Sequence, residues 1–139
     1  MRQVKLVLGV CVGMLAAFGA GWLLGSSGRG SSERALQAVE LRSDLLQARS
    51  LALAARVDLY NVNFGDASRH LEDAKGSLRR AAERLKAEGR TADVTRIEAA
   101  STLLDEAQKM AVRLDQGANA RAAAAAQAIA DMLGAEAKV

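Results

Sequence analysis

Few residues of this 139-residue chain are of types that carry chemistry. His70 is the only histidine and Cys11 is the only cysteine. A zinc site needs several nitrogen or sulfur ligands, and a catalytic nucleophile needs a base beside it. Cys11 lies in an apolar run far from His70 in the sequence. We therefore predict no catalytic residue, no metal site, no cofactor, and no enzymatic activity.

One oxygen-rich segment imitates a calcium loop. Asn61, Asn63 and Glu72 have the spacing of oxygen ligands in such a loop. However, Gly65 stands where a ligand belongs, and Asp66 stands where the turn needs glycine. A helical turn explains the same residues, since Asp66 can cap the next helix by accepting a backbone hydrogen bond. The segment therefore predicts a break between two helices.

An apolar segment near the start predicts a membrane anchor. The nineteen residues from Leu6 to Leu24 are uncharged and span about 28 Å as a helix, close to the thickness of a bilayer core. We predict a basic head over 1–5, a transmembrane helix over 6–24 and a Gly/Ser linker over 25–32. A cleaved signal peptide is the alternative, although its apolar core is usually shorter. Because a short head normally stays in the cytoplasm, we expect a single pass through the inner membrane, with the carboxyl-terminal domain in the periplasm.

One face of this apolar segment carries a small residue at every fourth position. Small residues let two helix backbones approach closely in lipid. The spacing therefore predicts helix pairing within the membrane. The residues are Gly9, Gly13, Ala17, Gly21 and Gly25.

The net charge of +3 comes entirely from cations around the apolar segment. Without Arg2, Lys5 and Arg29, sixteen of the nineteen cations remain, and they equal the sixteen acidic residues. With few aromatic residues as well, the chain is not expected to bind nucleic acid. No small-molecule substrate is indicated. A local basic cluster could contact anionic lipid headgroups, and it consists of Arg79, Arg80, Arg84, Lys86 and Arg90.

Residues 33–134 predict an all-α domain. Proline is absent and alanine, the best helix former, is abundant. Apolar residues alternate three and four apart in four stretches, which short breaks separate. The predicted core row of the second stretch is Ala67, Leu71, Ala74, Leu78, Ala81 and Leu85, and that of the third is Val94, Ile97, Ala100, Leu104, Ala107, Ala111 and Leu114. We therefore expect an alanine-rich antiparallel bundle of about four helices in two hairpins, followed by a frayed tail over 135–139. A long coiled coil is the alternative architecture. The predicted helices run from about Ser32 to Asn61, Asp66 to Gly89, Thr91 to Gly117 and Ala120 to Leu133.

The first predicted helix carries two apolar rows and one basic row. The apolar rows predict a wide face that packs on more than one neighbour. The basic row, Arg42, Arg49 and Arg56, is a candidate interaction face. Glu98 and Asp105 could face it across a helix interface, and the alternative is that these charges lie on a solvated face. The first apolar row is Ala38, Leu41, Leu45, Ala48, Ala52, Ala55, Leu59 and Val62, and the second is Val39, Leu46, Leu53 and Tyr60.

Residues 60–78 resemble part of a tetratricopeptide hairpin. Phe64, Ala67, Leu71 and Ala74 have the spacing of that repeat's turn aromatic and of its small and large positions. The resemblance implies a protein-binding surface without chemistry. The segment lacks the repeat's glycine in the first helix and its closing proline, and the first helix is longer than the pattern.

Together these features predict a bacterial membrane-anchored helical interaction module. It would act as a scaffold, an adaptor or an accessory subunit of a membrane complex, and its partner would be another protein or a second copy. The alternative is an exported periplasmic protein with a cleaved signal peptide, which acts as a helical binding or chaperone-like protein.

Overall fold

The computed structural model describes residues 32–137. These residues are helical apart from short turns, and no strand occurs among them. The predicted head, the transmembrane helix over 6–24 with its stripe of Gly9, Gly13, Ala17, Gly21 and Gly25, and the linker up to residue 31 lie outside the described residues. No helix between residues 32 and 137 is both long and apolar enough to cross a membrane.

Four helices make up the described residues. The first covers residues 32–60, and α2 (Phe64–Ala87), α3 (Thr91–Val112) and α4 (Ala118–Glu136) follow. By its contacts the chain divides into one unit that ends at Ala38 and a second that begins at Val39. The bundle described below is the second unit.

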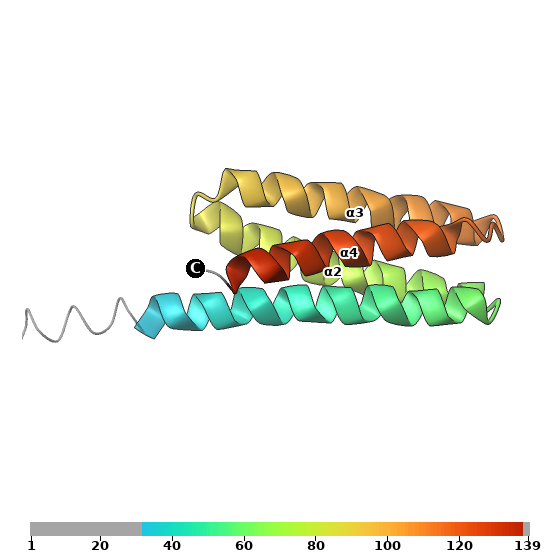
Figure 1. The fold of residues 1–139 in the computed structure, drawn as a ribbon, viewed down its shortest axis with the longest axis horizontal. Helices are drawn as coiled ribbons and strands as arrows, with labels where there is room; N and C mark the ends of the chain where they lie inside the picture. The colour runs from blue at the N-terminus through green and yellow to red at the C-terminus, as the bar shows by residue number, and fades with distance from the viewer. Residues whose placement is uncertain (1–31, 138–139) are drawn as a thin grey trace, which may run out of the picture. The chain divides into compact units, whose positions relative to one another are not determined.

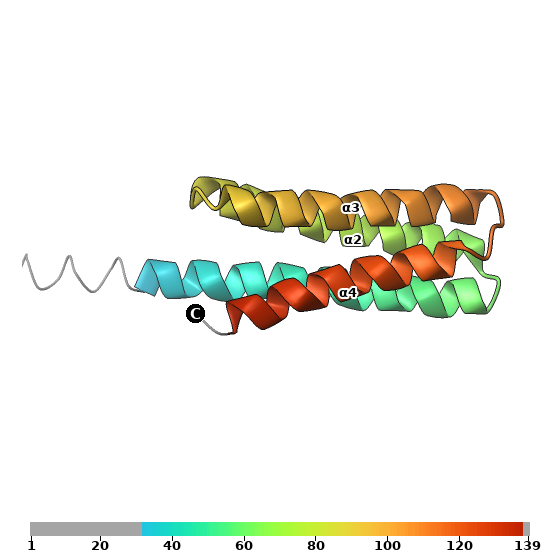
Figure 2. The ribbon, with the colours of Figure 1, turned by 45° about the horizontal axis from the view of Figure 1, so that its top comes forward.

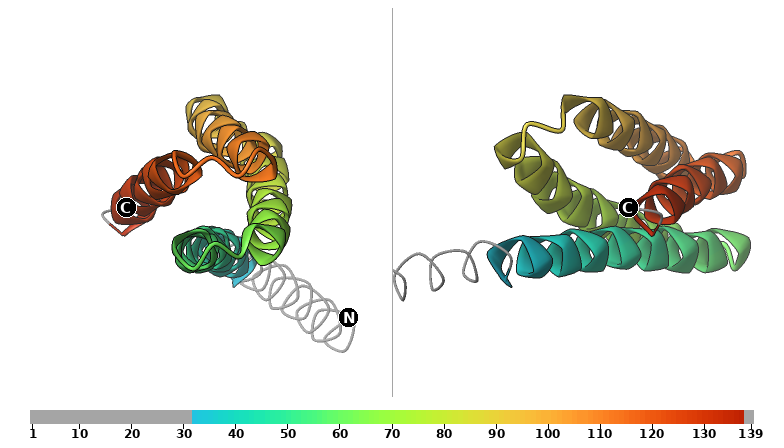
Figure 3. Two further views of the ribbon diagram at one scale, coloured as in Figure 1. Left: turned by 90° about the vertical axis from the view of Figure 1, so that its right-hand side faces the viewer. Right: turned by 60° about the vertical axis from the view of Figure 1, so that its left-hand side comes forward.

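The helices of the bundle alternate in direction, as the short turns predict. Figure 1 shows each helix returning alongside the one before it, with α2 packed on α3 and α3 packed on α4. The end-on view places the helices around a common centre in chain order (Figure 3). Figure 2 shows α4 returning beside the first helix, where Arg56 and Asn119 hydrogen-bond. The predicted all-α fold with four helices is therefore confirmed for the described residues.

The core consists mainly of alanine with a few leucines. Every predicted core residue of α2 is buried, which confirms the spacing of that helix. Because more than half of the buried apolar side chains are alanine, the helices must approach closely to exclude water. The buried residues of α2 that the spacing predicted are Ala67, Leu71, Ala74, Leu78, Ala81 and Leu85.

The wide apolar face predicted for the first helix is wrong. Only the first row packs inward, and even there Ala38 and Val62 are exposed. The second row is exposed along its whole length. Viewed down the helix axis, Leu46 lies about 100° from Leu45, and Val39 lies about 200° from Leu41. The second row therefore faces away from the neighbouring helices. Its members are Val39, Leu46, Leu53 and Tyr60.

Several helix ends differ from their predicted positions. Asn63, not Asp66, caps α2, and its side chain accepts a hydrogen bond from the Asp66 N–H. The third helix ends at Val112, and Leu114, predicted for the core, is exposed in the turn. At the last turn, Gly117 precedes α4 instead of closing α3, and α4 continues past the predicted end to Glu136.

All three turns between helices close in the same way. After the first helix, Val62 is left-handed at φ 61°, and the Asn63 N–H donates to the Asp58 carbonyl at 2.8 Å. This pattern satisfies the last carbonyls of a helix and favours glycine at the left-handed position. Only the turn after α2 has glycine there, Gly89 at φ 72°. The turn after α3 has Leu114 at φ 58°.

Candidate functional site

The most prominent surface feature of the bundle is a row of exposed apolar side chains on the first helix. We call this row the exposed seam. It lies opposite the row that packs into the core, and its members are three, four or seven residues apart. A helix displays such a row on one narrow face. The exposed seam consists of Val39 (65% exposed), Leu46 (45%), Leu53 (37%), Val57 (60%) and Tyr60 (83%).

The predicted arginine row runs along one edge of the exposed seam. Arg42 and Arg49 are exposed, and no ion pair joins them to any residue between 32 and 137. Arg56 is partly buried and points toward α4, where its Nε donates to Asn119 Oδ1 at 3.1 Å. Asn119 Nδ2 donates back to the Arg56 carbonyl at 3.0 Å. The row therefore offers two free cations, while the third residue joins the first helix to α4.

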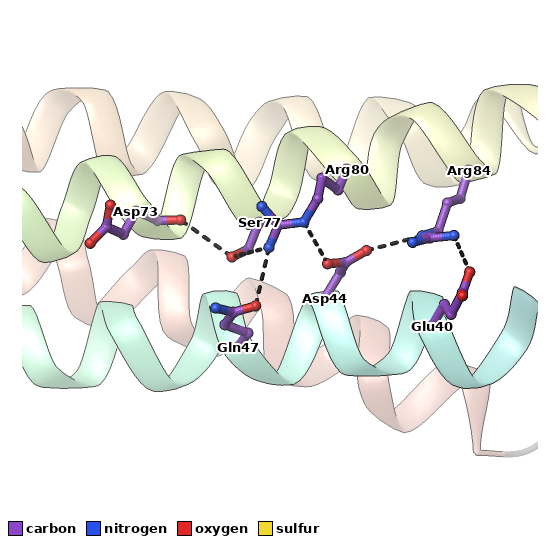
Figure 4. A network of polar contacts seen from close by, with 7 residues as sticks. All are labelled: Glu40, Asp44, Gln47, Asp73, Ser77, Arg80 and Arg84. Carbon is purple, nitrogen blue, oxygen red and sulfur yellow. Dashed lines mark hydrogen bonds and ion pairs between the residues drawn. The ribbon is translucent and has the colours of Figure 1, made fainter.

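A polar network joins the other side of the first helix to α2 (Figure 4). Asp44 is only 7% exposed, and both of its carboxylate oxygens are bound. Arg80 Nε donates to Oδ1 at 2.9 Å, and Arg84 Nε donates to Oδ2 at 3.0 Å. Arg80 also reaches Gln47 at 3.1 Å and Ser77 at 3.0 Å. Two arginines therefore pair with the buried carboxylate of Asp44. Burial of a charge is strongly destabilising unless an opposite charge pairs with it.

The guanidinium of Arg84 bridges two acidic residues of the first helix. Besides Asp44, it pairs with Glu40. The hydrogen bond with Asp44 and the charge of Glu40 raise the pKa of Arg84 above its ordinary value. An arginine is already charged near neutral pH, so both ion pairs of Arg84 are present there.

Arg90 makes a comparable junction at the turn between α2 and α3. It pairs with Glu136 of α4 and with Asp93 at 2.7 Å, and the hydrogen bond with Glu136 is the main reason that its pKa is raised. Arg80, Arg84 and Arg90 are each paired with a carboxylate, and they are three of the five cations of the predicted basic cluster. The cluster is therefore largely neutralised within the protein.

A third charged cluster joins α2 to α3. Lys75 Nζ donates to Asp105 at 2.8 Å and to Gln108 at 2.7 Å, and it also pairs with Glu72 at 2.7 Å. The expected contact between Asp105 and the arginine row is therefore wrong, because Asp105 faces α2. The hydrogen bond from Lys75 lowers the pKa of Glu72. Burial lowers the pKa of Lys75, but its bonds to Asp105 and Glu72 outweigh burial and raise it.

His70 has a carboxylate partner that the sequence did not reveal. Its Nδ1 lies 2.7 Å from Oδ2 of Asp58, near the end of the first helix, and both side chains are partly buried. No hydroxyl or thiol of residues 32–137 hydrogen-bonds to this ring. The pair joins the first helix to the first turns of α2.

The described part of the chain holds no candidate metal site, and it has an open groove beside the polar network. No three His, Cys, Asp or Glu side chains converge within residues 32–137 in a way that would hold a metal ion. The open groove is lined by Gln47 and Leu51 of the first helix and by Asp73, Gly76 and Arg80 of α2. Its lining is mostly polar, so the exposed seam remains the better candidate for a binding surface.

No family model, curated protein or solved structure matches this chain. The partial resemblance of residues 60–78 to a tetratricopeptide hairpin is therefore without support from these comparisons. The structure places Ala67, Leu71 and Ala74 in the core and Phe64 against it. These positions would be buried in any close antiparallel pair of helices.

Proposed function

We propose that this chain is a membrane-anchored helical interaction module without catalytic activity. In this proposal, the apolar segment over 6–24 holds the chain in the inner membrane, and the bundle lies in the periplasm. The bundle binds a protein partner of a membrane complex through the exposed seam. The single observation that supports the proposal most strongly is the exposure of that seam.

An exposed apolar row gains free energy when a partner covers it. Single exposed apolar side chains are ordinary on a protein surface, but a contiguous row marks a candidate interface. Burial of a valine- or leucine-sized side chain contributes about 1.5–3 kcal/mol. Five such side chains in one row, with Arg42 and Arg49 free at the edge, supply both an apolar contact and a charged rim.

A second candidate function is an exported periplasmic binding or chaperone-like protein. It uses the same exposed seam but requires that the apolar segment is removed. The sequence favours this candidate only through its small-x-small sites, Ala17-Phe18-Gly19 and Gly25-Ser26-Ser27.

Membrane fractionation and mass measurement of the mature chain separate these functions. We expect the full-length chain, with its first residues intact, in the membrane pellet after an alkaline wash. A mature protein that starts near Gly25 would support the second candidate. Recovery of the intact chain entirely in the supernatant would overturn the proposed anchor.

The binding surface has its own test. Leu53→Glu places a charge in the middle of the exposed seam and should abolish co-purification of the membrane complex. Val112→Glu is the matched control, because it makes the same kind of change at an exposed valine outside the seam. Equal co-purification of both variants would exclude the seam as the binding surface.

A further inference from the structure

We infer that the occupant of the exposed seam is a second copy of this chain, bound in parallel, so that two first helices form a two-stranded coiled coil. This inference rests on the proposed function and deepens it by naming the partner protein. It is carried by the spacing of the exposed seam, by the charges along its edges and by its place in the chain.

The spacing fits a pair of supercoiled helices. Two-stranded coiled coils bury two positions of each seven-residue repeat, three and four residues apart. The residues at these positions all lie on the face opposite the buried row, and each one is exposed. A second helix can therefore pack here without disturbing the bundle. One position carries Val39, Leu46, Leu53 and Tyr60, and the other carries Ser43, Ser50 and Val57.

The charges at the edges of the exposed seam select the parallel orientation. In an antiparallel pair the two arginine rows would face each other, and like charges repel. In a parallel pair each arginine instead faces the residue five positions later in the second copy. None of those residues is charged. For the two free arginines, the facing pairs are Arg42 with Gln47 and Arg49 with Ala54.

The order of segments along the chain favours the same arrangement. The exposed seam begins within fifteen residues of Leu24, the last residue of the predicted membrane helix. Two parallel copies would bring both predicted anchors to the same side, as two chains in one membrane require. The small-residue stripe predicts pairing there as well. Confinement to a membrane raises the effective concentration of the second copy.

The two serines predict how the coiled coil can be strengthened. Ser43 and Ser50 place hydroxyl groups at buried positions of the pair, which weakens it. β-Branched side chains at this repeat position favour two strands. The double variant Ser43→Ile/Ser50→Ile should therefore lower the dissociation constant of the dimer by roughly tenfold or more.

Cysteine cross-linking of the full chain tests both the partner and its orientation. In a Cys11→Ser background, Leu46→Cys and Tyr60→Cys are prepared separately in mild detergent and oxidised. A disulfide requires Cα atoms about 4.4–6.8 Å apart, so it forms between identical positions only in a parallel, aligned pair. We expect each variant to give a covalent dimer by itself. Glu83→Cys, exposed on α2, is the matched control and should remain monomeric.

Each other outcome has a defined meaning. A disulfide that forms only when Leu46→Cys and Val57→Cys chains are mixed would mean an antiparallel pair, which sets unlike repeat positions against each other, and would overturn the parallel coiled coil. No disulfide at either position would overturn the second copy as partner. In that case, loss of the membrane complex in Leu53→Glu would still support the proposed function with a different protein at the seam, so the two failures are distinguishable.

Discussion

Asp44 is the one charged residue that is buried among the described residues, and it lies in the contact between the first helix and α2. Its carboxylate is nearly inaccessible to water, and both oxygens are bound by arginines of α2. A buried charge that loses its partners is far more costly than a buried pair is stabilising. The arginines themselves lie partly in solvent and lose little when they are released.

We predict that Arg80→Ala/Arg84→Ala lowers the free energy of unfolding by about 3 kcal/mol, since the Asp44 carboxylate is left buried without a cation. Adding Asp44→Leu should restore most of this loss, because no charge then remains in the interface. Denaturant titration followed by circular dichroism measures both effects. Arg79→Ala, an exposed neighbour, is the control and should change stability by less than about 0.5 kcal/mol. A triple variant no more stable than the double variant would contradict the explanation.

The Lys75 cluster predicts how stability depends on pH. The pKa of Glu72 is held below its ordinary value of 4.5, so its contribution is present above that pH and is lost as the pH falls through the folded-state pKa. The pKa of Lys75 is raised above 10.5, so its contribution is present below that pH and is lost at higher pH. Between these limits the cluster contributes fully.

We therefore expect Lys75→Met to flatten the acid side of the stability profile. Between about pH 5 and about pH 3, the wild type should lose more stability than the variant, because Lys75 is the main group that holds the pKa of Glu72 low. Denaturation midpoints at each pH measure the difference. Parallel profiles for the two proteins would show that Lys75 is not the cause.

At the scale of elements, the three turns share one geometry but not one residue type. Left-handed backbone is strained for a side chain with a Cβ, and most of all for a β-branched one. Gly89 meets this requirement, whereas Val62 and Leu114 do not. Both strained side chains are also largely exposed, so burial does not compensate for the strain.

We predict that Val62→Gly and Leu114→Gly each raise the free energy of unfolding by up to about 1 kcal/mol, since relief of backbone strain exceeds the added freedom of the unfolded chain. Gly89→Ala should lower it by about 1 kcal/mol, and the open space around this glycine leaves the backbone as the only cause. Thermal melting measures all three variants. A lower melting temperature for Val62→Gly would mean that its side chain stabilises the turn.

The elements also show what the sequence can and cannot predict. The core row of α2 was predicted in full, because helical periodicity is a local property of the chain. Leu114 was misplaced because it continues the apolar spacing of α3 two residues beyond the helix end, where no glycine marks the turn. Asp44 was missed because its partners on α2 lie 36 and 40 residues away in the sequence.

The exposed seam is a second feature whose position the sequence did not predict correctly. Its spacing is as regular as that of the buried row, so the sequence predicted that both rows would pack within the domain. Only the arrangement of the neighbouring helices decides which row faces the core. Four of the five residues of the exposed seam were therefore predicted as an apolar row, but they were wrongly expected to pack within the domain, and Val57 was not predicted.

For the whole molecule, the alanine-rich core predicts strong sensitivity to larger side chains. Ala52, Ala74 and Ala81 are completely buried, and their methyl groups set the distance between helices. We expect Ala74→Leu to lower the free energy of unfolding by about 3 kcal/mol, because the helices must separate to admit the larger side chain. Ala124→Leu on the exposed side of α4 is the control and should be nearly neutral. Equal stability of the two variants in denaturant titration would mean that the core is loosely packed.

Helices lined with alanine and leucine at seven-residue intervals have several alignments of similar apolar burial. If the first helix slid along α2 by one repeat, Gln37 or Leu51 would replace Asp44 between the two arginines. The displaced carboxylate would then lie buried without a cation. We therefore expect the polar network to disfavour these shifted alignments, which the apolar interface alone would not distinguish. In this way a single buried carboxylate would fix the register of an otherwise uniform interior.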